Sequence, residues 1–133
     1  MKAVKWDEIP DEEVRPGVRR RGFGTRDVLL VMNECHPGMD LRPHSHEFDQ
    51  LALIVSGTAI YHVGDDHNEV GPGSVMLVPA GVEHYIEPTG NDPVMNLDVF
   101  APAREDYMHL LDWMRERGMV AEGTPPQLSL IHI

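Results

Sequence analysis

Three histidines and one glutamine have the residue types and the spacing of a metal site. His44 and His46 lie two residues apart in HSHEFDQ, and Gln50 follows just before the apolar run LALIV. In an extended chain, side chains two residues apart point to the same side, so both imidazoles can reach one ion. His84 supplies a third imidazole after the turn PAG. We therefore expect one divalent transition metal, Fe, Mn, Ni, Zn or Cu, with coordination positions left open for water or substrate.

A second group of candidate residues lies in VMNLDVFAPAR, residues 94–104. Strand alternation places Asp98 and Phe100 on one face. If that face is internal, Asp98 is a candidate proton carrier, with a pKa raised by burial or lowered by a nearby cation. Phe100 could contact a ring or an enol. Arg104 suits a substrate carboxylate, and the open alternative is that it pairs with one of the two acidic residues that follow it.

These side chains need a β framework to bring them together. Short β-prone runs alternate with turn signals from Val18 to Phe100. The runs are VLLVMNE, LALIVSG, TAIYHV, SVMLVP and VMNLDVF, and the turns are HPG, GDDHN, GPG, PAG and TGNDP. The pattern indicates an all-β sandwich or barrel, and 133 residues are the size of one domain.

The chain divides into four segments around this framework. Residues 1–17 are acidic and contain prolines, and we expect an arm that wraps the barrel of residues 18–102 as an edge strand or loop. Apolar residues at three- and four-residue steps predict one helix over residues 103–118, with an apolar stripe that packs on the core. The apolar tail, residues 119–133, either docks on a partner subunit or is loosely ordered.

The composition restricts the partners of the chain. There are 22 acidic and 11 basic residues, and the formal net charge of -11 repels nucleic acid phosphates and anionic lipids. We therefore expect no nucleic acid and no membrane partner. Cys35 has no second cysteine to pair with and is expected in the core, and the chain starts without an apolar signal segment. Both features favour a cytoplasmic protein.

Two further histidines are expected outside the site. His62 falls on a predicted outer hairpin and His67 in its turn, within TAIYHVGDDH. A histidine in such a place is usually solvated. We therefore leave both out of the predicted ligand set.

The spacing of the candidate ligands resembles both signature motifs of the cupin superfamily. Residues 38–57 read G-x5-H-x-H-x3-Q-x6-G, residues 73–84 read G-x5-P-A-G-x2-H, and fifteen residues separate them. The resemblance implies a single-domain jelly-roll barrel with a short C-terminal helix. The usual glutamate ligand is Gln50 here, and an amide leaves the site more positive than a carboxylate would, which favours Lewis-acid chemistry. The alternative is a cupin whose metal site has become a polar core.

The run LDVFAPAREDY, residues 97–107, resembles the closing strand of the KdgF-type pectin-degradation cupins. These small proteins convert unsaturated monouronates to linear keto forms. The resemblance assigns the metal to His44, His46, Gln50 and His84, and substrate-facing roles to Asp98, Phe100 and Arg104. It implies that the metal polarises a substrate oxygen, Asp98 moves a proton between oxygen and carbon, and Arg104 holds the acid group.

The activity that this resemblance implies is isomerisation or tautomerisation of an unsaturated uronate or a related small carbonyl or enol acid. Three alternatives from other classes stay open. They are an Fe(II) dioxygenase that cleaves a diketone or enol, a metal-dependent lyase, and a non-catalytic small-ligand sensor. Most cupins pair through an edge strand, and the terminal run LSLIHI could extend a sheet across two chains, so we also predict a homodimer.

Overall fold

Residues 3–119 are described by the computed structural model, and most of their regular structure is β-strand. The nine strands are β1 Glu12–Arg15, β2 Val18–Gly24, β3 Leu29–Cys35, β4 Gln50–Ser56, β5 Ala59–Val63, β6 Asp66–Val70, β7 Val75–Val78, β8 His84–Pro88 and β9 Val94–Phe100. The helical elements are the 3-10 helices η1 Trp6–Glu8 and η2 Glu105–Leu111 and the α-helix α1 Asp112–Glu116. Within the described part of the chain, no helix has the length and apolar character needed to span a membrane.

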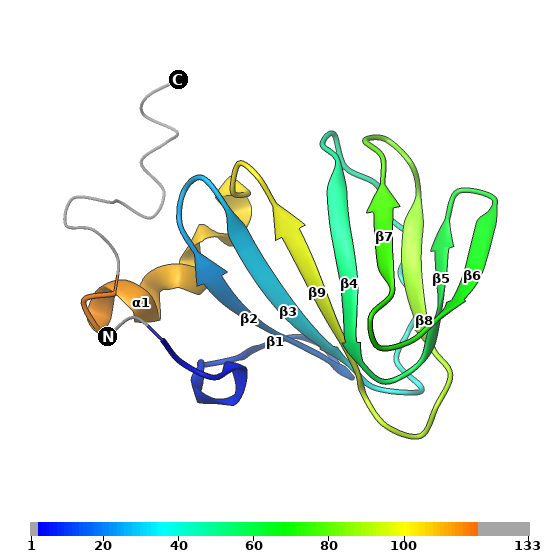
Figure 1. The fold of residues 1–133 in the computed structure, drawn as a ribbon, viewed down its shortest axis with the longest axis horizontal. Helices are drawn as coiled ribbons and strands as arrows, with labels where there is room; N and C mark the ends of the chain where they lie inside the picture. Colours follow the sequence, from blue (N-terminus) through cyan, green and yellow to red (C-terminus); the bar gives the residue numbers. More distant parts are fainter. Residues whose placement is uncertain (1–2, 120–133) are drawn as a thin grey trace.

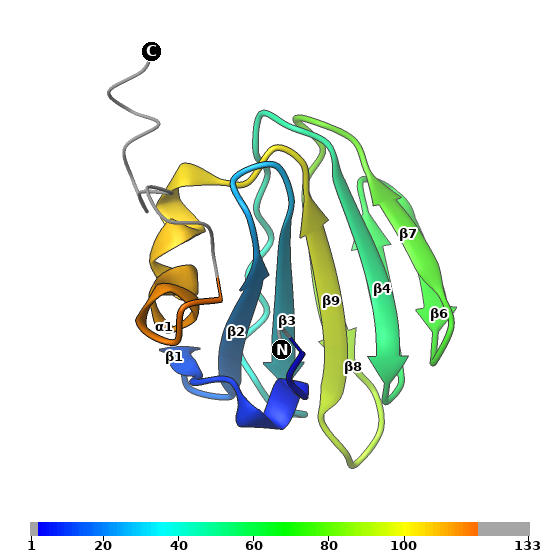
Figure 2. The same cartoon turned by 60° about the vertical axis from the view of Figure 1, so that its left-hand side comes forward.

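The strands form two antiparallel sheets. The larger has the order β1-β2-β3-β9-β4-β7 and the smaller the order β6-β5-β8. In Figure 1 the segment from η2 to α1 lies beside β2 at one end of the larger sheet, and β5, β6 and β8 lie at the other end. Figure 2 shows the larger sheet in front with β8 behind it. The all-β architecture with a short C-terminal helix, expected from the sequence, is confirmed, with its strands divided between two sheets.

Strand alternation decides which side chains enter the interior. Ala52 and Ile54 of β4 are buried, whereas Leu51 and Val55, on the opposite face, are about half exposed. On β9, Asp98 pairs with Ala52 of β4 and also with a residue of β3, and directly opposite residues share a face. The register therefore places Asp98 on the inner face, which is the condition under which the sequence made it a candidate proton carrier.

Two different parts of the chain, the smaller sheet and the C-terminal helical segment, cover the inner face of the larger sheet. Between the sheets lie two small clusters of buried apolar residues, one that includes Ile54 and Val94 and one around Ala52 and Tyr61. At the other end, the helical segment packs its own apolar side chains against β3 and β9. The helical cluster consists of Ile9, Leu29, Val31, Phe100, Met108, Leu110, Leu111, Trp113, Met114 and Met119. Polar residues lie on the inner face between these cores.

The C-terminal helical segment differs from the single helix predicted over residues 103–118. It starts as the 3-10 helix η2 and becomes α-helical only at Asp112. In a 3-10 helix residues three apart lie on the same side, so Met108 and Leu111 are both buried against the sheet. Trp113 is also buried, and its indole Nε1 donates to the Gly22 carbonyl oxygen at 2.9 Å. The buried stripe is therefore wider than the periodicity predicted.

The expected turn GDDHN is also shorter than predicted. Only Gly64 and Asp65 form the turn, and Gly64 has the positive φ of 58° that such a tight hairpin needs. The strand β6 begins directly after it, so His67 pairs with His62 across the hairpin. The predicted placement of His67 in the turn was wrong, because the turn has only two residues and the residues after it belong to β6. Its exposure to solvent agrees with the prediction.

Two other expectations concern single residues and the tail. Cys35 is buried, as predicted, and burial raises the pKa of its thiol to about 12. Met119, the first residue of the predicted tail, is buried in the helical cluster. Residues 120–133 lie outside the described residues, and with them the run LSLIHI that was predicted to extend a sheet.

Gly22 tests the contact between β2 and η2. A Cβ at this position would lie 2.5 Å from the Leu110 Cβ, which is too close for two carbon atoms. We expect Gly22→Ala to lower the free energy of unfolding by ~1–3 kcal/mol in urea denaturation, because the helix must shift. In the control Gly71→Ala, the nearest atom lies 3.9 Å away, and the change should stay within ~0.5 kcal/mol. Equal effects of the two substitutions would contradict this packing.

Candidate metal centre

Three histidine side chains from separate parts of the chain converge at one point. The ligand nitrogens of His44, His46 and His84 all lie within 4.8 Å of one another. The ring centroids of His44 and His84 are 4.3 Å apart, and those of His46 and His84 are 4.8 Å apart. His84 is buried, while His44 is exposed. The cluster therefore has a buried side and a side that opens to solvent.

The backbone sets the separation of the two ligand-bearing segments. His44 and His84 form an isolated antiparallel bridge. The His44 amide nitrogen lies 3.2 Å from the His84 carbonyl oxygen, and the His84 amide nitrogen lies 2.9 Å from the His44 carbonyl oxygen. The amide of Gly81 also donates to the His46 carbonyl oxygen at 2.7 Å. The strand expected around His44 and His46 is therefore an extended segment with a single bridge residue. Its two-residue alternation is still enough to bring both imidazoles together.

Each of the three imidazoles has its Nδ1 atom fixed by a backbone carbonyl oxygen two residues away. A carbonyl oxygen can only accept, so each Nδ1 carries a hydrogen, and in the neutral imidazole Nε2 then presents its lone pair. Such a hydrogen bond is the usual support of a metal-binding histidine. The pairs are His44 with Arg42 at 2.8 Å, His46 with Phe48 at 3.0 Å and His84 with Val82 at 3.0 Å.

His84 shows most clearly that the cluster suits a cation. Its Nε2 atom is buried and has no hydrogen-bond partner among the described residues. Burial, together with smaller contributions from His44, His46 and Arg104, lowers the pKa of His84 to about 4, although the hydrogen bond to the Val82 carbonyl acts to raise it. The imidazole is therefore neutral at pH 7, which is the form that binds a metal ion.

Gln50 completes the donor set that the sequence predicted. It is the buried first residue of β4, and its Oε1 lies 2.9 Å from His46 Nε2. Its Nε2 donates to Asp98 Oδ1 at 2.8 Å, and this bond turns the amide oxygen toward the histidines. Two acceptor atoms this close repel each other unless a cation lies with them, either a metal ion or the proton of an imidazolium. Three imidazole nitrogens and one amide oxygen thus fit a divalent transition metal.

Asp98 lies behind Gln50 and is held by three side-chain amides. Its carboxylate accepts from Asn33 at 2.9 Å, from Gln50 at 2.8 Å and from Asn96 at 2.8 Å. Burial raises the pKa of the Asp98 carboxyl to about 7, although the three amide donors and the Arg104 charge act to lower it. A carboxyl group with this pKa can both accept and release a proton near neutral pH.

A cavity of about 420 Å³ joins these groups to the solvent. Its wall includes His44, Gln50, His84 and Asp98. Tyr107 of η2 and residues of both sheets line the remainder. The cavity therefore lies on the inner face of the larger sheet, between the smaller sheet and the helical segment. The volume is that of a small-molecule site.

Arg104 lies near the histidines but already has a carboxylate partner. Its guanidinium donates two hydrogen bonds to Asp106, at 2.7 and 3.0 Å. It lies over the Tyr107 ring at 3.8 Å and 5.2 Å from the ring centroids of Phe48 and Phe100. The structure thus shows the pairing that the sequence left open. A substrate-binding role of Arg104, which stays a prediction, would require this ion pair to be shared or opened.

Two aromatic side chains pack against His46. Phe100 is buried in the helical cluster and meets the His46 ring edge-on at 6.4 Å, so its predicted contact with substrate remains a prediction. Phe48 is stacked on the His46 ring at 4.4 Å with an interplanar angle of 4°. Sequence reasoning missed Phe48, and it also missed Asn33 beside Asp98. Asn33 carries no spacing signal, because it reaches Asp98 through the pairing of β3 with β9. Phe48 follows His46 by two residues, and this spacing was a signal that could have found it.

Comparison with known proteins gives a consistent assignment. Residues 32–100 match the family described as Cupin domain. An uncharacterized protein of Streptomyces coelicolor is 31% identical over 103 residues, which are 77% of this chain and 97% of the relative. An acireductone dioxygenase of Exiguobacterium sibiricum is 26% identical over 99 residues, which are 66% of this chain. The match covers only 55% of that dioxygenase. The structure of KdgF from Halomonas sp. has a TM-score of 0.69 and 26% identity, and covers 77% of this chain and 95% of KdgF.

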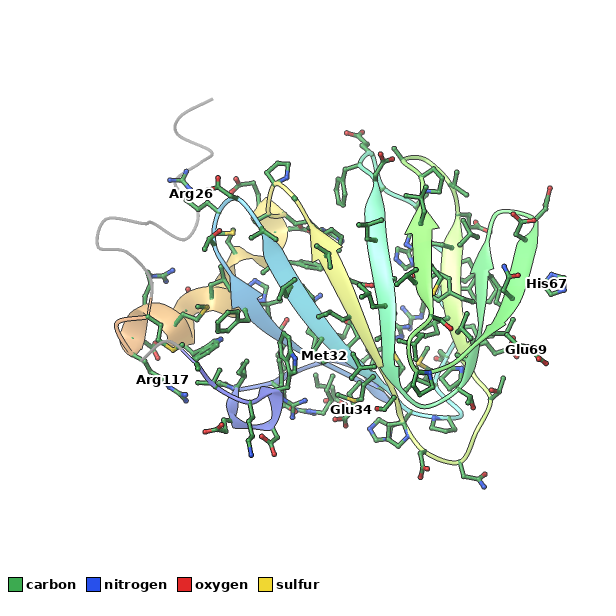
Figure 3. All side chains as sticks on the ribbon, in the orientation of Figure 1. Arg26, Met32, Glu34, His67, Glu69 and Arg117 are labelled. Atoms are coloured by element: carbon green, nitrogen blue, oxygen red, sulfur yellow. The ribbon has the colours of Figure 1, made fainter. Side chains whose placement is uncertain are left out.

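Metal titration tests the centre directly. After treatment with a chelator, the protein should bind one Zn²⁺ or Co²⁺ ion per chain, measured by calorimetry and, for Co²⁺, by visible absorption. We expect His84→Ala to weaken binding at least tenfold, because a buried ligand is lost. His67→Ala is the control, since Figure 3 shows His67 pointing outward from β6 and its strand is exposed. Equal losses in the two variants, or no binding by the unaltered chain, would refute the site.

Proposed function

The chain belongs to the cupin family, and we propose that it is a metal-dependent enzyme that isomerises or tautomerises a small carbonyl or enol acid, such as an unsaturated uronate. The observation that carries the proposal is the adjacency of two functional groups on one cavity wall. A neutral set of metal ligands lies beside a carboxyl group whose pKa is about 7. Proton transfer next to a polarised oxygen requires this combination.

The residues of the chain divide the work of such a reaction. A bound divalent ion would act as a Lewis acid on a substrate oxygen. Asp98 moves the proton between the oxygen and carbon of the substrate, and Asn33 and Asn96 hold its carboxyl group in place. Gln50, in place of a carboxylate, leaves the centre more positive. Phe48 and Phe100, packed on His46, limit the movement of that ring.

The similarity to KdgF from Halomonas sp. supports this chemistry, because most of both chains is covered. The same ligand spacing and the run of residues 97–107 resemble the KdgF type. A second candidate function has its own support. The similarity to acireductone dioxygenases, together with three histidines, favours an Fe(II) enzyme that cleaves an enol with oxygen.

A spectroscopic assay separates these functions. We expect the metal-loaded protein to remove the ultraviolet absorbance of an unsaturated monouronate, and the chelator-treated protein to leave it unchanged. Asp98→Asn should lower kcat by about 100-fold or more, because it removes the proton carrier, and should still bind one Zn²⁺ per chain. Glu69→Gln, an exposed change on β6, should leave kcat unaltered (Figure 3).

Other outcomes of this assay would contradict the proposed isomerase activity or the proposed role of Asp98. Stoichiometric oxygen consumption by the iron form would replace the isomerase with the dioxygenase. Release of a carbonyl fragment would indicate a lyase. If Asp98→Asn retained full turnover, the role of Asp98 as proton carrier would be wrong. If the unaltered chain and Asp98→Asn bound the ligand equally and neither turned it over, the protein would be a sensor.

We also propose that the chain forms a homodimer through the outer face of the larger sheet. Leu51 and Val55 of β4 and Val75 and Leu77 of β7 are between 50% and 73% exposed. Leu51 and Leu77 pair directly, and β7 is the last strand of its sheet. An uncharged apolar face allows two chains of net charge -11 to meet without direct repulsion. A second copy is therefore the occupant we assign to this face.

Sedimentation tests the dimer. The unaltered chain should sediment as a dimer at micromolar concentration. Leu77→Lys should raise the dissociation constant at least tenfold, because it places a charge in the apolar contact. Val28→Lys introduces the same charge at another exposed apolar residue, in the loop before β3, and should have no effect. A monomeric unaltered chain would contradict the assignment.

A further inference from the structure

The cavity beside the metal centre contains more positive charge than the chain as a whole suggests. Three arginines, Arg15, Arg20 and Arg42, contribute to its wall. Arg20 is neutralised by Glu12, with an Nε to Oε2 distance of 2.6 Å. Arg15 and Arg42 have no carboxylate partner among residues 3–119. Because the chain has 22 acidic and 11 basic residues, two unpaired arginines on one cavity wall require an explanation.

Arg15 is the less solvated of these two side chains. It is the last residue of β1 and is partly buried, and its Nε atom is buried without a hydrogen-bond partner in the described part of the chain. One Nη atom lies 3.4 Å from the Asp40 carbonyl oxygen, which is a long contact. Burial and the positive charge of Arg42 hold the pKa of Arg15 below its usual value, although the Asp40 carboxylate, which forms no ion pair with it, acts to raise it. A buried, unsatisfied N–H donor is normally paired, so an acceptor is missing here.

Arg42 connects this wall to the metal centre. It lies two residues before His44 on the segment between β3 and β4, and its carbonyl oxygen accepts the hydrogen bond from His44 Nδ1. Its side chain lines the same cavity as Arg15 and is exposed. The backbone of Arg42 therefore positions a candidate ligand, while its charged side chain is free for another role.

Two other arginines without a carboxylate partner provide a contrast. Arg26 lies in the turn between β2 and β3, and Arg117 follows α1 and lies 5.0 Å from the Trp113 ring centroid. Figure 3 shows both near the helical end of the molecule, and neither lines the cavity. They are ordinary surface cations. Among residues 3–119, only Arg15 and Arg42 place unpaired positive charge in the space that also contains His44, His84 and Gln50.

We propose that Arg15 and Arg42 form an oxyanion-binding subsite that holds the acid group of the substrate. That the bound acid is a substrate rests on the function proposed above, whereas the subsite itself rests on the cavity alone. A carboxylate between two guanidinium groups accepts charge-assisted hydrogen bonds and removes the repulsion between them. The inference differs from the resemblance to KdgF, which assigns the acid group to Arg104. Arg104 already binds a carboxylate in this structure, that of Asp106.

The location of the subsite also defines the orientation of the ligand. The acid group lies toward β1 and the segment before His44, and the rest of the molecule extends toward His84 and Asp98. A cavity of about 420 Å³ accommodates a small acid of this kind. The substrate class is therefore a small acid with its reactive oxygen at the end remote from the acid group.

Binding to the chelator-treated protein tests the subsite without relying on catalysis. The probes are galacturonate, its uncharged methyl ester and inorganic phosphate, titrated by calorimetry. We expect Arg15→Gln and Arg42→Gln each to weaken galacturonate binding at least tenfold, and the methyl ester to bind at least tenfold more weakly than the acid. Arg26→Gln is the matched control and should bind as the unaltered chain does. Arg15→Lys keeps the charge without the planar fork and should lose less affinity than Arg15→Gln.

The outcomes separate the subsite from the proposed reaction. Galacturonate or phosphate binding that depends on Arg15 and Arg42 supports the subsite even if no unsaturated uronate is turned over. Phosphate binding alone would also support it and would identify phosphate as the preferred acid group. Absence of binding by both anions would overturn the subsite, as would equal losses in Arg26→Gln. Turnover of an unsaturated uronate with an unchanged KM in both arginine variants would overturn it while leaving the reaction intact.

Discussion

The structure depends on holding several hydrogen-bond acceptor atoms close together with no donor hydrogen among them. The Nε2 atoms of His46 and His84 and the Oε1 atom of Gln50 are all acceptors, and they lie together at the inner face of a β-sheet. Acceptors in this arrangement repel one another, so the fold must supply the constraint. Carbonyl oxygens hold every Nδ1 atom, and a pair of peptide hydrogen bonds joins His44 to His84. The energetic cost of this arrangement is recovered when a cation is present.

Asp98 both supports the ligand set and has the properties of a proton carrier. Its carboxylate fixes the amide of Gln50, and the environment that makes this possible also raises the pKa of the carboxyl group. Asn33 and Asn96 provide further donors, so the group is hydrogen-bonded yet poorly solvated. One side chain thus orients a ligand and is available for proton transfer. A change at Asp98 should be interpreted with both effects in mind.

The parts of this site that could be predicted are those that strand alternation or the spacing of a known pair of motifs indicates. Alternation placed Asp98 and Phe100 on one face without deciding whether that face is internal, and the motif spacing grouped His44, His46 and Gln50 with His84. Arg15 and Asn33 were missed because they reach the site through the tertiary fold. Arg15 comes from an edge strand almost thirty residues before His44, and Asn33 meets Asp98 across the pairing of β3 with β9. The pairing of Arg104 was left open, because two carboxylates follow it and spacing alone does not decide between pairing and a free guanidinium.

The backbone bridge between His44 and His84 has a consequence for the choice of ion. Because peptide hydrogen bonds fix these two ligands relative to each other, they cannot move apart freely to suit a larger ionic radius. The Gly81 amide ties His46 to the same neighbouring segment, so a larger or smaller ion must be accommodated by side-chain torsions and not by separation of the backbone segments. Differences in coordination between one metal and another should therefore appear in the χ angles of the ligand side chains, while the Cα separation of His44 and His84 stays constant.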